Sequence, residues 1–280
     1  MNWSEMSLLF SARQDSERDL IARWLPHLQT RQIRLATALV YLALIALAEL
    51  LTTFAEPRIG LALHGGLLVI LLLHAALASG HPHHRFLLGL ALAPLIRMLS
   101  LSLPLLDFPV LYWYVIISVP LFVATVLAAR ILGFSREQLG LTIRKVPLQF
   151  FVALTGIAFG IVEYYILRPE PLIANPTWQS ILVSGLILML CTGFAEELIF
   201  RGLIQRASVQ ALGRFGLLYV AILFAVLHIG YGSLLDMIFV FTVALLFGWV
   251  AEATWSLLGV TLAHGLTNIV LFLVMPFWGP

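Results

Sequence analysis

The residues best suited to chemistry lie in the last third of this chain. The segment from Gly193 to Gly202 reads GFAEELIFRG, so two adjacent carboxylates, Glu196 and Glu197, precede Arg201. On an α-helix Glu197 and Arg201 are i and i+4 neighbours that can form a charge-assisted pair, whereas Glu196 lies about 100° around the helix. One carboxylate can therefore be held by the arginine while its neighbour reacts.

Glu196 is the better candidate for a general base. Two neighbouring carboxylates resist ionising together, and the one that lacks a cationic partner is the one suited to take up a proton. A pair of glutamates near an arginine can also mark a helix end that meets the membrane interface. A catalytic interpretation of this segment therefore depends on polar motifs elsewhere in the chain.

Two such motifs occur on later helices. Phe224 and His228 form an FxxxH segment, and His264 and Asn268 form an HxxxN segment. A spacing of four puts His264 and Asn268 on one helical face, from which both can point into the same polar cavity. A carboxylate and an imidazole can take a proton from a shared water, and an imidazole N–H and a carboxamide NH₂ suit a developing oxyanion.

The elements that carry these residues are predicted to be membrane-spanning helices. The chain has 280 residues, of which 61% are hydrophobic and 11% charged, against about 45–50% and about 25% in soluble proteins. Long apolar runs without period-2 alternation exclude a barrel and predict an all-α polytopic membrane protein of eight or nine transmembrane helices, with the active site in the helix bundle. The predicted spans are 35–55, 59–79, 86–106, 110–129, 147–167, 178–200, 216–230, 234–253 and 256–275.

Other ionisable residues inside these spans are given structural explanations. Glu49, Glu163 and Glu252 lie near span ends, where snorkelling toward the headgroups accounts for them. His64 and His74 are assigned to interhelical hydrogen bonds, because a lone histidine in a membrane helix more often packs than reacts. Arg97 and Asp236 are also intramembrane, and no function is assigned to them.

The basic residues predict the topology. With nine crossings and a cytoplasmic N-terminus, every basic residue outside the spans except Arg58 and Arg168 falls on the inside, where positive charge is favoured. We therefore expect a cytoplasmic N-terminus, in a bacterial inner membrane. This inside set includes residues of a predicted cytoplasmic loop at 201–215. The alternatives are a sixth span that continues past Arg201 and a tilted or re-entrant segment at 203–215, because either would let Glu196 meet His228. The basic residues are not interleaved with stacking aromatics, so no nucleic-acid partner is expected.

The three motifs together resemble those of the CAAX protease and bacteriocin-processing family, which includes the type II CAAX prenyl endopeptidase. The resemblance covers about residues 130–275, including an LGLT segment at 139–142. It implies that Glu196 and His228 activate the attacking water, that His264 and Asn268 stabilise the oxyanion, and that Glu197 and Arg201 order the site. The resemblance implies a catalytic core at 130–280. Before it, residue composition predicts a cytoplasmic lead-in at 1–34 with the composition of an interfacial helix, and N-terminal transmembrane helices of unknown role at 35–129.

The favoured mechanism is of the glutamate type and requires no cofactor. A zinc site remains open, because Glu196, His228 and His264 would supply three ligands and an open position. Against zinc, the sequence has no HExxH, and its only cysteine is Cys191. The expected partners are membrane lipid and a hydrophobic, lipid-anchored or membrane-tethered peptide cleaved near its C-terminal tail.

Two other classes of function stay open at this point. A transporter also uses buried Glu, His and Arg, although no matching pair of broken helices occurs in the two halves. A non-catalytic scaffold or immunity protein could retain the motifs without turnover. Rhomboid-type and aspartyl intramembrane proteases are disfavoured, since neither GxSG nor GxGD occurs.

Overall fold

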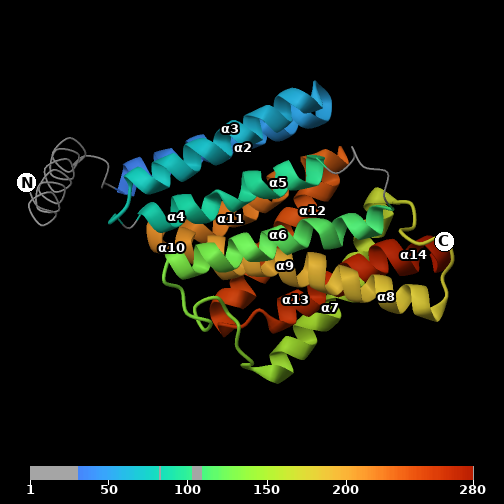
Figure 1. Ribbon diagram of the computed structural model, residues 1–280. Coiled ribbons are helices and arrows are strands. Elements are labelled where there is room, and N and C mark those ends of the chain that lie inside the picture. Colours follow the sequence, from blue (N-terminus) through green and yellow to red (C-terminus); the bar gives the residue numbers. More distant parts are fainter. Residues whose placement is uncertain (1–30, 82, 103–108, 280) are drawn as a thin grey trace, which may run out of the picture. The chain divides into compact units, whose positions relative to one another are not determined.

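The computed structural model describes residues 31–81, 83–102 and 109–279, and all regular secondary structure in these ranges is helical, as predicted (Figure 1). Most of the expected lead-in at 1–34 lies outside the described residues. The chain divides into two compact units, Met1–Tyr41 and Leu42–Pro280.

The helices confirm the predicted membrane architecture. In the described part of the chain, eight helices are long and apolar enough to cross a bilayer, and a shorter apolar helix covers Phe215–Tyr231. The protein is therefore an integral membrane protein. The helical elements are α2 (Arg31–Phe54), α3 (Pro57–Leu77), α4 (His83–Leu90), α5 (Leu92–Ser102), α6 (Val110–Ile131), α7 (Val146–Leu167), α8 (Trp178–Leu188), η3 (Met189–Phe194), α9 (Ala195–Glu197), η4 (Leu198–Ile204), α10 (Gln205–Leu212), α11 (Phe215–Val226), η5 (Ile229–Tyr231), α12 (Leu234–Thr254), α13 (Leu258–Ile269), η6 (Val270–Val274) and α14 (Met275–Trp278).

The predicted cytoplasmic loop at 201–215 is wrong. The sixth long helix runs without a break from Trp178 to Leu212, and only Gly213, with φ +65, ends it. Its polar residues misled the prediction because they are satisfied inside the protein. Arg206 pairs with Glu252 at 2.7 Å, and Gln205 donates to the carbonyl of Gly248 at 2.9 Å.

Two of the glutamates assigned to span ends are buried. Glu49 is fully buried and forms a two-bond ion pair with Arg97, at 2.5 and 2.8 Å. Glu163 is 8% exposed. Snorkelling therefore does not describe either residue, because both carboxylates face neighbouring helices instead of headgroups. His64 is also buried, and its Nε2 lies 3.0 Å from Glu49 Oε1 on another helix, an interhelical contact without the geometry of the expected hydrogen bond.

Local signals explain several helix boundaries. Thr177 caps α8 by accepting from the Ser180 amide, and Ser233 caps α12 by accepting from the Asp236 amide, both at 3.2 Å. Such hydroxyl caps satisfy amides that have no partner within the helix. At the other end of α12, Trp255 takes a left-handed conformation with φ 56. This turn directs the chain back toward α13.

Close contact between α7 and α13 sets the position of the last motif, and the two helices lie side by side in Figure 1. A Cβ at Gly156 would lie 2.1 Å from the carbonyl oxygen of Ala263, so only glycine permits this approach. At the start of α13, Gln149 of α7 accepts a hydrogen bond from the Gly259 amide at 2.7 Å. The side chain of Gln149 thus satisfies an amide at the N-terminus of α13.

The LGLT segment fixes the same end of α13 from a different direction. The amide of Leu257 donates to the carbonyl of Gly140 at 2.9 Å, and Ser256 donates to the carbonyl of Thr142 at 2.6 Å. The loop at 139–142 is therefore joined to the turn between α12 and α13.

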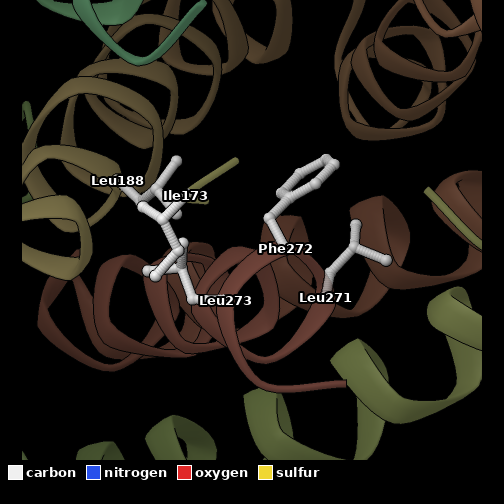
Figure 2. Packing of buried hydrophobic residues seen from close by; sticks show 5 residues of the cluster. All are labelled: Ile173, Leu188, Leu271, Phe272 and Leu273. Atoms are coloured by element: carbon white, nitrogen blue, oxygen red, sulfur yellow. The ribbon is translucent and has the colours of Figure 1, made fainter. Parts of the chain in front are cut away.

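At the opposite end, apolar packing joins α8 to the end of the chain. Figure 2 shows Leu273 directed toward Leu188 and Ile173, while Phe272 and Leu271 project from the other side of η6. All five side chains are buried. Burial of an apolar side chain of this size contributes roughly 1.5–3 kcal/mol, which holds η6 and α13 against the helix that carries the glutamates.

Candidate active site

All six polar motif residues line one small cavity. Its volume is about 80 Å³, enough for more than one water molecule. The structure therefore brings together residues separated by up to 72 positions in the chain, from Glu196 to Asn268. The lining residues are Tyr114, Glu163, Thr192, Glu196, Glu197, Arg201, Phe224, His228, Tyr231, Phe239, Val240, Val243, Phe247, His264, Thr267, Asn268, Leu271 and Phe272, and we call this space the motif cavity.

The two adjacent glutamates have different surroundings. Glu197 is fully buried, and its Oε1 accepts from Arg201 Nη1 at 3.0 Å and from His264 Nδ1 at 2.9 Å. The Glu196 side chain is 35% exposed, and its nearest cationic atom is His264 Nε2, at 3.9 Å. The carboxylate of Glu197 is thus held on two sides, while that of Glu196 remains available at the cavity.

The helix that carries these carboxylates is irregular on both sides of them. The residues Met189–Phe194 and Leu198–Ile204 form π-helical turns around the short α9. A π-turn inserts a residue into the helical repeat and changes the direction of the side chains after it, and such turns occur frequently at functional sites. Nothing in the residue spacing indicated these turns.

The FxxxH motif contributes two contacts at the motif cavity, one from the Phe224 ring to Arg201 and one from the His228 ring to a backbone carbonyl. The guanidinium carbon of Arg201 lies 4.4 Å from the centre of the Phe224 ring, a cation–π contact that supports a buried arginine. His228 Nδ1 lies 2.8 Å from the Phe224 carbonyl oxygen. A carbonyl only accepts, so Nδ1 carries the hydrogen, and in the neutral ring Nε2 keeps a free lone pair.

On α13, Asn268 is oriented by a hydroxyl that the sequence did not single out. Its Nδ2 donates to Thr192 Oγ1 at 2.8 Å, and Thr192 in turn donates to the carbonyl of Leu188 at 2.5 Å. One N–H of the carboxamide is therefore committed to Thr192 and a second remains for another acceptor. Thr192 lies four residues before Glu196, so helical spacing was the signal that could have found it.

Glu163, Tyr114 and Tyr231 also line the cavity and were not predicted as site residues. Tyr231 follows His228 by three residues, and its ring stacks on the imidazole with centroids 5.8 Å apart. Glu163 and Tyr114 are far from the motifs in sequence and come from α7 and α6. No sequence pattern places Glu163 and Tyr114 in the site, and only the packing of the helices brings them to the cavity.

The side chains proposed as zinc ligands do not form a metal cluster. Over the described residues, no group of three or more His, Cys, Asp or Glu side chains is arranged to hold a metal ion. The gap of 3.9 Å between His264 Nε2 and Glu196 Oε2 also exceeds the roughly 3.0–3.5 Å expected between two ligands of one tetrahedral zinc. In this structure Glu196, His228 and His264 are therefore not brought together as a set of metal ligands.

Comparison with known proteins agrees with the motifs. Residues 177–270 match the family described as type II CAAX prenyl endopeptidase Rce1-like. No match was found among curated proteins or among solved structures. The matched region begins at the start of α8, contains all three motifs and ends in η6, within the core expected at 130–280. The resemblance seen in the sequence is confirmed over residues 177–270, where this membrane protein matches the Rce1-like family model.

Proposed function

We propose that this protein is an intramembrane endopeptidase that uses Glu196 and His228 to activate water. One observation carries the proposal, namely the unequal surroundings of Glu196 and Glu197 in a cavity that also holds both histidines and Asn268. A helix-capping or packing role would not require one carboxylate to stay open beside another that is paired twice.

The proposed reaction begins with a water held between Glu196 and Nε2 of His228. The Glu196 carboxylate takes a proton from this water, and the oxygen attacks the carbonyl carbon of the scissile peptide bond. The carbonyl oxygen becomes an oxyanion. An electron pair on the oxyanion then re-forms the carbonyl double bond while the C–N bond breaks. Glu196 delivers its proton to the nitrogen of the departing amine.

Asn268 and His264 are proposed as the oxyanion donors. The second N–H of the Asn268 carboxamide is available, since Thr192 accepts only one. With Nδ1–H directed at Glu197, His264 has a hydrogen on Nε2 only in its imidazolium form. In that form His264 would meet the oxyanion as a charged donor.

The decisive experiment is cleavage of a membrane-peptide library by purified protein in lipid. Wild type is compared with Glu196→Ala and His228→Ala, and each is assayed with and without a chelator. Loss of cleavage in both variants, with full activity of wild type in chelator, is the expected result. Glu137→Gln, which removes an exposed carboxylate paired with Arg144 in the loop after α6, is the control for general loss of charge.

Three outcomes would contradict parts of this proposal. Loss of wild-type cleavage in chelator would show that a metal takes part. Cleavage that survives both alanine variants would place the reaction elsewhere. A folded wild type that cleaves nothing would favour the scaffold and transporter alternatives.

We also propose that the protein lies in a bacterial inner membrane with its N-terminus in the cytoplasm. Tagging each terminus and measuring on which side of the membrane the tag lies tests this topology.

A further inference from the structure

A second cavity lies against the other side of the proposed catalytic pair. Its volume is about 240 Å³, larger than that of the motif cavity. The two cavities share five lining residues, namely Tyr114, Glu196, Phe224, His228 and Tyr231. A peptide whose scissile bond lies at Glu196 and His228 would therefore extend into this second space.

The second cavity is mostly apolar but contains one cation. Its remaining lining residues are Ile96, Arg97, Ser100, Ile117, Leu121, Cys191, Ala195, Ile199, Phe200 and Leu227, and we call this space the Arg97 cavity. Arg97 comes from α5, outside the region that matches the family. Its guanidinium lies close to the backbone just after His228, since a Cβ on Gly230 would be 3.6 Å from Arg97 Nη2.

Arg97 is fixed in place on one edge of its guanidinium. Nε and Nη2 donate to the two oxygens of Glu49, at 2.5 and 2.8 Å, and Glu49 is itself contacted by His64 at 3.0 Å. Glu49 and His64 are fully buried. Two ionisable side chains on two other helices are thus used to hold one guanidinium. Burying ionisable groups in a bilayer is costly, so this arrangement calls for a function.

The other edge of the guanidinium remains available. An arginine has five N–H donors, and the bonds to Glu49 use one from Nε and one from Nη2. Within the described ranges, the Arg97 side chain bonds to no other group, and 16% of it is exposed where it lines the cavity. The edge formed by Nη1 and Nη2 has the spacing that a carboxylate accepts through two parallel hydrogen bonds.

We propose that Arg97 binds the C-terminal carboxylate of an apolar peptide that occupies the Arg97 cavity. This inference rests on the proposed function, because it takes Glu196 and His228 as the point of cleavage. The apolar walls suit hydrophobic side chains, and the single cation at the wall suits one negative charge on the same segment. Arg97 is then a specificity-determining residue that selects substrates cut a short distance from a free C-terminus.

The test measures binding and cleavage separately. A short apolar peptide is prepared as the free acid and as the C-terminal amide, and its affinity is measured for purified Glu196→Gln protein in phosphatidylcholine vesicles. The free acid is expected to bind about 10- to 100-fold more tightly, the range of a charge-assisted hydrogen bond. Cleavage of the same two peptides by wild type is measured in parallel.

Two variants in the Glu196→Gln background test whether Arg97 causes the preference for the free acid over the amide. Because Arg97→Gln alone would leave Glu49 buried without a cation, the informative change is Glu49→Gln with Arg97→Gln, which keeps a neutral hydrogen-bonding pair. This double change is expected to abolish the preference for the acid while amide binding persists. Arg144→Gln, which removes an exposed arginine from a loop, is the matched control and should keep the preference.

The inference is overturned if acid and amide bind equally, or if the preference survives the double change. It is also overturned if phosphatidylglycerol in the vesicles removes the preference, because a lipid headgroup would then occupy the guanidinium. Peptide binding with the expected preference but no wild-type cleavage would instead contradict the proposed function and leave the Arg97 assignment intact.

Discussion

His264 donates through Nδ1 to Glu197 Oε1 over 2.9 Å, across 67 positions of sequence. The same oxygen accepts from Arg201, one turn along its own helix. This contact joins the first and third motifs directly, and it determines which ring nitrogen of His264 faces Glu196. The proposed chemistry therefore depends on Glu197, although Glu197 itself takes no part in the bond-making steps.

The two glutamates are expected to respond differently to the same substitution. Glu196→Gln should lower kcat by about 10²–10⁴-fold through loss of the general base, with little change in thermal stability. Glu197→Gln should also lower stability, by about 3–5 kcal/mol, because it leaves buried Arg201 without its counter-ion. Peptide cleavage and thermal unfolding in detergent measure the two effects. Equal loss of stability in both variants would contradict this division of roles.

Thr192→Val is expected to weaken catalysis without removing any group from the reaction. Valine retains the shape of threonine but cannot accept from Asn268 Nδ2, so the carboxamide loses its orientation. We expect kcat to fall about tenfold with KM nearly unchanged, a smaller loss than the roughly 10²–10³-fold expected when an oxyanion donor itself is removed, as in Asn268→Ala. Steady-state kinetics on one peptide decides this, and a larger loss in Thr192→Val than in Asn268→Ala would be inconsistent with it.

Phe224→Leu should affect two of the proposed groups at once. The aromatic ring contacts the guanidinium of Arg201, and its centroid lies 4.8 Å from that of the His228 ring. Leucine keeps an apolar side chain but loses the cation–π contribution, about 0.5–2 kcal/mol. We expect lower stability and lower kcat, and we expect Phe224→Tyr to restore stability. If leucine and tyrosine behave alike, ring electrostatics at this position are unimportant.

Gly156→Ala tests whether the contact between α7 and α13 positions the site. An added Cβ would lie 2.1 Å from the Ala263 carbonyl oxygen, so the helices must separate and move His264. We expect at least a tenfold loss of kcat/KM, in line with the sensitivity of catalysis to displacements of about 1 Å.

Gly66→Ala is the control for that substitution, since a Cβ at Gly66 meets nothing within 4 Å. In the interior of α3 it should be neutral or stabilising by about 0.5–1 kcal/mol. Activity of Gly156→Ala equal to that of Gly66→Ala would show that the helix contact is not needed.

Hydropathy and motif spacing were sufficient to predict the helices of this protein and one of the ion pairs at its candidate site. Runs of about 20 apolar residues must be helical in lipid, because every amide has to be satisfied within the segment. The pair of Glu197 and Arg201 follows from a spacing of four, and the structure has it at 3.0 Å. The all-helical architecture, the membrane location and the likeness of residues 177–270 to the Rce1-like family were therefore accessible without coordinates.

The remaining features depend on which helix faces which. Composition cannot show that Glu49 and Glu163 point into the protein, so both were taken for interfacial residues, and the polar stretch after Arg201 was taken for a loop because its partners lie on α12. The contact of His264 with Glu197, the bond of Asn268 to Thr192 and the cavity at Arg97 each join residues that no local pattern relates. The sequence by itself determined the helices and the reactive groups, since these follow from transfer free energy and helical repeat; only the tertiary structure decided their partners, because interhelical distances depend on how side chains pack.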